Sequence, residues 1–265
     1  MGSGGDSSHY THYKSGLPVS RFIEYPLSLS MPLTQTPLRK VYGRNRGPMT
    51  TDANTSANIT AQTTIVQRVS LRGRHFFAQQ FIGLDETQAH WQDLEFEECE
   101  FHDCQFSDST FRQCKFIDCR FVGCNLSLVK VSLSHFNGVS FEECKLVGVD
   151  WTRASWPRVA FAAPFTFKAC ILNDSSFMGI KLDEMVLEAC KVHDVDFREG
   201  SFNRANFTFS DFRHSLFGRT ELLEADFSEA TDYDIDIFNN KIKGAKFSRD
   251  EAIRLLNGLD ITLVD

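Results

Sequence analysis

Cysteine and histidine are the residues here that could ligate a metal, form disulfides or serve as nucleophile and base. The chain has 265 residues, with eight of each type. Structural zinc sites need ligands at spacings such as C-x₂-C, and no two cysteines stand that close: Cys99, Cys104, Cys114, Cys119, Cys124, Cys144, Cys170 and Cys190. Nucleophile-elbow, phosphate-loop and H-E-x-x-H motifs are also absent. The sequence therefore predicts no metal, no cofactor and no catalytic residue.

An excess of phenylalanine indicates which elements position these residues. There are 25 Phe against 5 Tyr and 3 Trp. An apolar residue recurs at every fifth position in two series: Trp91, Phe96, Phe101, Phe106, Phe111, Phe116, Phe121, Leu126, Val131, Phe136, Phe141, Leu146, Trp151, Trp156, Phe161; then Phe167, Leu172, Phe177, Leu182, Leu187, Val192, Phe197, Phe202, Phe207, Phe212, Phe217, Leu222, Phe227. This spacing would scatter side chains around an α-helix and alternate them across a straight strand. It fits a chain that turns a corner every five residues.

A small residue stands two positions before most of these large ones. All eight cysteines occupy this position, and Ser or Ala holds most of the others. Residues two apart share a face in an extended chain. We therefore expect the small and the large residue of each segment to point inside, with polar residues outside.

This pattern resembles the pentapeptide-repeat proteins, whose motif is A(D/N)LXX. The segments Cys-Glu-Phe-His-Asp (99–103), Ala-Asn-Phe-Thr-Phe (205–209) and Ala-Asp-Phe-Ser-Glu (225–229) match it. The resemblance covers roughly residues 66–247 and implies an all-β fold, a right-handed quadrilateral β-helix with four pentapeptides per coil. A solenoid packed with Phe offers no cleft for a substrate, so we expect a protein that is not an enzyme.

A coil of four pentapeptides requires that positions four repeats apart stack. The expected columns are Phe96, Phe116, Phe136 and Trp156; Phe101, Phe121, Phe141 and Phe161; and Phe177, Phe197, Phe217 and Ile237. Stacked cysteines would point the same way, which is poor geometry for a disulfide. We expect eight free thiols in a reducing compartment, the cytoplasm. No signal peptide and no apolar run long enough for a membrane span is present.

The frame changes once, at Phe161-Ala-Ala-Pro-Phe-Thr-Phe167, where six residues replace five. Two interpretations stay open. The change is either a tolerated kink between two stacks or a contact loop for a partner, made by Ala162, Ala163 and Pro164.

The repeat stops after Phe247. Ser248 and Glu251 match the S-x-x-E capping box, which predicts a short helix that ends at Asn257-Gly258, followed by a terminal strand at 261–264. Solenoid ends expose unpaired edges, so these elements either cap the end or pack against a second copy. We favour a homodimer, with an interface of Leu255, Leu256, Ile261, Leu263 and Val264.

Charge divides the chain, with a net of +4 over residues 1–48 and −11 over residues 49–265. The acidic part argues against direct nucleic-acid binding. Over roughly nine coils it averages about −1.2 per coil, whereas DNA carries about 2.8 negative charges in the same 4.8 Å. Imitation of DNA therefore needs local concentrations of acid, and the partner-binding candidates are Asp93, Glu95, Glu97, Glu98, Glu100, Asp103, Asp183, Glu184, Glu221 and Glu224.

Within the family, the chain resembles the topoisomerase-protecting members, of the Qnr quinolone-resistance and microcin-immunity types. The two stacks with their F-x-x-P-F-T-F junction, the acidic surface and the helix–strand end carry this likeness. It implies a DNA mimic that binds DNA gyrase, topoisomerase IV or both and protects them from a poison. The alternative is an interaction scaffold or effector module without a topoisomerase link.

Three parts are expected along the chain. Residues 1–61 form a flexible segment, either added to the protein or a natural arm. Residues 62–247 form the β-helix, and residues 248–265 form the capping or dimerisation element.

Overall fold

The computed structural model describes residues 74–156, 165–259, 261, 262 and 264. Every described residue belongs to one compact unit, Ile59–Asp265. The expectations for residues 1–73 lie outside the described part.

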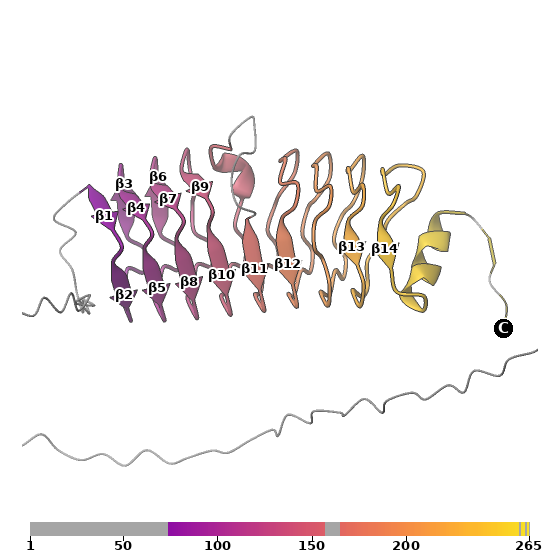
Figure 1. The fold of residues 1–265 in the computed structure, drawn as a ribbon, viewed down its shortest axis with the longest axis horizontal. Coiled ribbons are helices and arrows are strands. Elements are labelled where there is room, and N and C mark those ends of the chain that lie inside the picture. The colour runs from indigo at the N-terminus through magenta and orange to yellow at the C-terminus, as the bar shows by residue number, and fades with distance from the viewer. Residues whose placement is uncertain (1–73, 157–164, 260, 263, 265) are drawn as a thin grey trace, which may run out of the picture. The chain divides into compact units, whose positions relative to one another are not determined.

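Short strands and two 3₁₀ helices make up this unit (Figure 1). They are β1 (His75–Phe77), β2 (Gln80–Ile82), β3 (His90–Gln92), β4 (Glu95–Glu97), β5 (Glu100–His102), β6 (Thr110–Arg112), β7 (Lys115–Ile117), β8 (Arg120–Val122), β9 (His135–Asn137), β10 (Ser140–Glu142), η1 (Trp151–Arg153), β11 (Thr166–Lys168), β12 (Val186–Glu188), β13 (Asp226–Phe227), β14 (Lys246–Phe247) and η2 (Glu251–Leu259).

Parallel pairing between successive coils builds the solenoid. One sheet runs β1-β4-β7-β9 and another runs β12-β11-β10-β8-β5-β2. The register offset is one coil of four pentapeptides, as in Phe76↔Phe96 and Phe101↔Phe121. Isolated bridges such as Asp196↔Leu216 continue the ladders where no strand is formed. The predicted right-handed, four-sided β-helix is therefore the fold of this unit.

The core is a set of stacked aromatic rings. Ring centroids in the Phe96–Phe116–Phe136 column are 5.2 Å apart at each step. Phe101 and Phe121 stack at 4.5 Å. Most of these side chains are fully buried, and each contributes about 2 kcal/mol by leaving water. This column of rings holds each coil in register with the next.

The coil corners need a left-handed backbone. Twenty-four described non-glycine residues have positive φ, in addition to six glycines. Asp103 is one example, with φ of 53°, two positions after Phe101. Asp and Gly tolerate this conformation better than most residues, which explains their frequency two positions after the large inward residue.

The coil that contains the frame change at 161–167 is longer than the sequence predicted, so the expected stacking of Phe161 on Phe141 was wrong. Phe141 pairs with Phe167 on the following coil. The hydrogen bond from Cys170 to Phe141 spans 29 positions, whereas the equivalent bond from Cys124 to Phe101 spans 23. This coil is therefore longer than the others by more than one whole pentapeptide.

The added length lies between Phe141 and Phe167, whose rings stack at 5.1 Å. Ring packing therefore determines which residue stacks on Phe141 after the irregular segment. That residue is Phe167, whereas the sequence predicted Phe161. Phe161 and the proposed contact residues at 162–164 lie outside the described residues.

Two further column members were also placed wrongly. Trp156 is half-buried and tilted by 31° against Phe136, because Phe165 packs edge-on against it at 5.3 Å and is the residue that is buried. Ile237 is half-buried as well, while Tyr233 and Ile235 fill the interior of the last coil. Both deviations occur where the five-residue spacing breaks.

The chain end differs from the expected helix and strand. The helix, η2, is of the 3₁₀ type and continues to Leu259. Ile261, Thr262 and Val264 are in no strand.

The capping box is not formed either. The Ser248 hydroxyl donates to Glu229 Oε1 at 3.0 Å, and Glu251 Oε1 accepts from the Asp232 backbone N–H at 2.8 Å. Both side chains therefore bind the coil that the helix covers.

Candidate functional site

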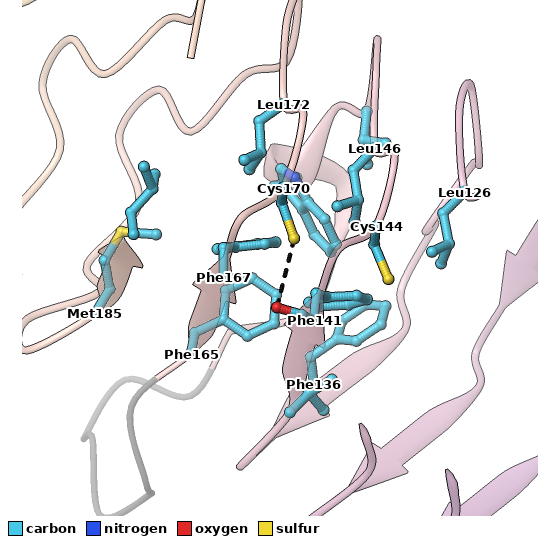
Figure 2. Close-up of a cluster of buried hydrophobic side chains, with 14 of the residues drawn as sticks. Leu126, Phe136, Phe141, Cys144, Leu146, Phe165, Phe167, Cys170, Leu172 and Met185 are labelled. Atoms are coloured by element: carbon cyan, nitrogen blue, oxygen red, sulfur yellow. Dashed lines mark hydrogen bonds between the residues drawn. The ribbon is translucent and has the colours of Figure 1, made fainter. Parts of the chain in front are cut away.

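The eight cysteines form hydrogen bonds inside the solenoid. All are buried and free. Cys170 Sγ donates to the carbonyl of Phe141 in the preceding coil at 3.4 Å (Figure 2). Among the described residues, no group of three His, Cys, Asp or Glu is placed to hold a metal ion. The cysteines thus belong to the packing, and the outer surface is the candidate site.

Acidic residues in the middle of the coil faces are mostly paired with bases of a neighbouring coil. Glu95 Oε2 lies 3.1 Å from Lys115 Nζ, and Glu97 Oε2 lies 3.3 Å from His75 Nε2. Glu100 Oε2 accepts from Gln80 and lies 2.9 Å from His102 Nε2. These three candidates are therefore engaged within the solenoid.

Acidic residues at the corners are mostly unpaired. Four of them, Asp93, Glu98, Asp103 and Asp108, stand five residues apart, are exposed and have positive φ. None has an ion-pair partner among the described residues. They mark the four corners of a single coil, and we call them the acidic collar. The sequence candidates included all but Asp108, which the same five-residue spacing could have identified.

The corner glycine of the next coil makes room for a collar carboxylate. A Cβ atom on Gly123, which has φ of +62°, would stand 2.6 Å from Asp103 Oδ1. Asp118 has the same relation to Gly138. An acid followed one coil later by glycine thus marks a corner whose carboxylate has no base beneath it.

The later acidic candidates share one face but differ in their state. Glu184 is paired with Arg204 at 2.8 Å and Glu221 with Lys241 at 2.5 Å. The hydrogen bond from Lys241 lowers the pKa of Glu221 below its ordinary value. Asp183 accepts from Ser201 Oγ and the Asn203 backbone N–H. Only Glu224 is exposed and without an ion-pair partner among the described residues.

Acidic residues are densest in the first described coils. Residues 75–111 contain nine acids and no Lys or Arg: Asp85, Glu86, Asp93, Glu95, Glu97, Glu98, Glu100, Asp103 and Asp108. This stretch is just under two coils, about 9.6 Å, over which duplex DNA carries about six charges. Its charge density therefore exceeds that of DNA, which the average over the whole solenoid hides.

The predicted dimer residues lie in different surroundings. Leu255 packs against the core, and Leu256 is half-buried. Ile261 and Val264 are exposed, and Leu263 lies outside the described residues. Ile253, exposed by 53%, was not among the sequence candidates, because the capping-box pattern gives no direction to the side chains of a 3₁₀ helix.

Comparison with known proteins gives one family and several related folds. The family model of the pentapeptide repeat region matches residues 94–164 and 149–227. No curated protein sequence matches the chain. No helix in the described ranges is long and apolar enough to cross a membrane.

Three solved structures are among the matches. Trypsin-treated QnrB1, a plasmid-mediated fluoroquinolone resistance protein, is 20% identical, with 76% of this chain and 96% of that chain covered and a TM-score of 0.48. Full-length QnrB1 is 22% identical, with 71% and 90% covered and a TM-score of 0.42. HetL, a pentapeptide repeat protein involved in heterocyst differentiation regulation from Nostoc sp. strain PCC 7120, is 12% identical, with 64% and 84% covered and a TM-score of 0.31.

Proposed function

The chain belongs to the pentapeptide-repeat family, and from that premise we propose that it is a non-enzymatic, cytoplasmic DNA mimic that binds DNA gyrase or topoisomerase IV. By occupying the DNA-binding surface it protects the enzyme from a poison such as a quinolone or a peptide toxin.

The observation that supports this proposal is the charge of residues 75–111. Nine acids without a Lys or Arg give this stretch more negative charge per length than a DNA duplex. A surface that binds DNA through Lys and Arg recognises such a density without reading any base. The acidic collar is the part of the stretch that no base of the described solenoid compensates.

Contact therefore centres on the acidic collar and its two coils. The pairs at Glu184 and Glu221 make that later face a poorer candidate, because their charges are already opposed within 3 Å. The predicted contact loop at 162–164 remains a second, shape-dependent contact to be tested separately.

A supercoiling assay tests the proposal. Purified protein is titrated into gyrase and topoisomerase IV reactions with and without a quinolone, and poison-induced DNA cleavage is measured beside supercoiling. We expect cleavage to fall at micromolar protein, and a complex to form at low salt. If neither activity changes and no complex forms, the alternative of an interaction scaffold unrelated to topoisomerases replaces this proposal.

A further inference from the structure

Three bulky apolar residues occupy corners where they gain nothing from the fold. Leu128, Leu133 and Phe209 have φ values of 60°, 58° and 59° and are exposed by 51%, 55% and 61%. A left-handed backbone is unfavourable for such side chains, and exposure removes the benefit of burial. Strain of this kind concentrates at functional positions.

Leu128 and Leu133 stand at the two ends of one coil segment, and a groove opens between that segment and the next coil. Its volume is about 490 Å³, and its lining includes Leu128, Lys130, Ser132, Gly148 and Arg153. The lining residue Ser132 is small, and Gly148 makes room for the Leu128 side chain, because a Cβ atom on Gly148 would stand 2.7 Å from Leu128 Cδ2. The Leu133 backbone N–H donates to the Arg153 carbonyl at 2.8 Å and joins the two coils at the edge of the groove.

The charges in and beside this groove are not balanced. Asp150 is engaged by Arg153, at 3.1 Å. Lys130 in the groove and Arg112 on the preceding coil are exposed, and neither has an ion-pair partner in the described ranges. Asp108 lies at the rim and is the single collar residue that the groove includes. Among the groups without an ion-pair partner in the described ranges, two cations, Lys130 and Arg112, thus outnumber one acid, Asp108, beside the exposed leucines.

We propose that this groove docks a segment of a partner protein that presents an apolar side chain next to a carboxylate. The two leucines receive the apolar side chain, and Lys130 with Arg112 receives the carboxylate. Apolar patches framed by charged residues are typical of protein-binding surfaces. Topoisomerase binding is proposed for the acidic collar, of which only Asp108 reaches this groove, so variants at Leu128, Leu133 and Lys130 test the groove separately.

Selection of peptides tests this inference. A phage library of random 12-residue peptides is selected against the full chain, and the enriched peptides are synthesised with a fluorescent label. We expect them to carry Asp or Glu beside an apolar residue. Fluorescence polarisation should show binding at least about tenfold weaker for the double variant Leu128→Asn, Leu133→Asn and for Lys130→Glu.

The control variant is Phe209→Asn, which removes an exposed apolar side chain from a left-handed corner away from the groove. It should bind like wild type. Because Asn tolerates the left-handed backbone, both Asn variants should keep or raise the thermal unfolding midpoint, which separates lost binding from unfolding.

Three outcomes would overturn the inference. The first is that no peptide is enriched, or that the enriched peptides bind the double variant as tightly as the wild type. The second is a consensus without acidic residues. The third is that a 12-base-pair DNA duplex binds the chain and that Lys130→Glu abolishes this binding, which would assign the groove to nucleic acid.

Discussion

The small inward residue of each pentapeptide is a hydrogen-bonding group as well as a space-filler. Ser134 Oγ donates to the Phe111 carbonyl at 2.9 Å and accepts from the Cys114 backbone N–H at 3.0 Å. Cys124 Sγ makes the same two contacts with Phe101 and Cys104, at 3.3 and 3.4 Å. A hydroxyl or thiol here satisfies backbone groups of the preceding coil, which explains why Cys and Ser recur at this position.

Replacing this group with a methyl should destabilise the solenoid. We expect Ser134→Ala to lower the free energy of unfolding by about 1–3 kcal/mol, because two buried backbone groups lose their partner. Ser134→Cys, which keeps a donor and an acceptor, should cost less than half of that. Urea unfolding measures both, and equal losses would show that the hydrogen bonds contribute nothing.

The thiols should be free and should make stability depend on alkaline pH. Burial raises the pKa of Cys114 to about 11. Since the folded state holds the protonated thiol more firmly than the unfolded chain, this contribution is constant below about pH 8.5 and is lost as the pH rises toward 11. Urea unfolding at pH 8 and pH 10.5 should show the loss, and Cys114→Ser should reduce it. Alkylation under denaturing, non-reducing conditions should modify all eight thiols; a disulfide population would contradict this prediction.

At the scale of elements, η2 covers the end of the solenoid through polar contacts. Arg254 Nη2 lies 2.5 Å from Asp232 Oδ1 and also pairs with Glu251. Leu255 faces the core, whereas Ile253 and Ile261 are exposed by 53% and 55%. One side of this segment thus covers the end of the solenoid, and its other side exposes apolar residues. This exposure supports the predicted homodimer.

If the predicted homodimer forms through this segment, removal of the segment should abolish it. We expect a chain truncated after Phe247 to form monomers or aggregates, because the last coil loses its cover. Light scattering measures the mass, and Ile253→Ser with Ile261→Ser in the full chain should give soluble monomers. A truncated protein that stays a soluble dimer would contradict an interface in this segment.

At the scale of the whole molecule, the density of charge changes from coil to coil along the solenoid rather than from one face to another. The first described coils carry nine acids without a Lys or Arg, whereas several later acids, such as Glu184 and Glu199, pair with an Arg one coil away. A basic partner therefore meets the highest density of negative charge at the first described coils. The attraction should weaken with salt, because exposed charges are screened beyond about 8 Å at physiological ionic strength.

Neutralising the acidic collar should weaken topoisomerase binding more than an equal change elsewhere. The test variant carries Asn or Gln at Asp93, Glu98, Asp103 and Asp108. The matched control carries Gln at four acids that pair with Lys168, Arg204, Arg219 and Lys241, namely Glu188, Glu184, Glu199 and Glu221. We expect the dissociation constant to rise about tenfold or more for the collar variant and about threefold or less for the control. Equal losses would indicate a response to net charge alone.

The sequence by itself determined the coil, the inward residues and the register of four pentapeptides. The five-residue period can be read from a short stretch of sequence. A chain that turns a corner every five residues is the regular structure in which Phe101, Phe121 and their neighbours all face inward. It also placed all eight cysteines inside the fold. These features depend on the chain's own repeat, which can be counted along the sequence.

Only the tertiary structure decided the length of the irregular coil, the state of each acid and the groove beside Leu128. Phe167, not Phe161, follows Phe141 in the stack because ring packing selects the register after a break. Glu95 and Glu98 are alike in sequence, yet Glu95 meets Lys115 on the next coil and Glu98 meets no base there. Such contacts join residues one coil apart. They depend on the direction of the side chain and on the residue that the neighbouring coil presents, and the local sequence pattern does not determine them.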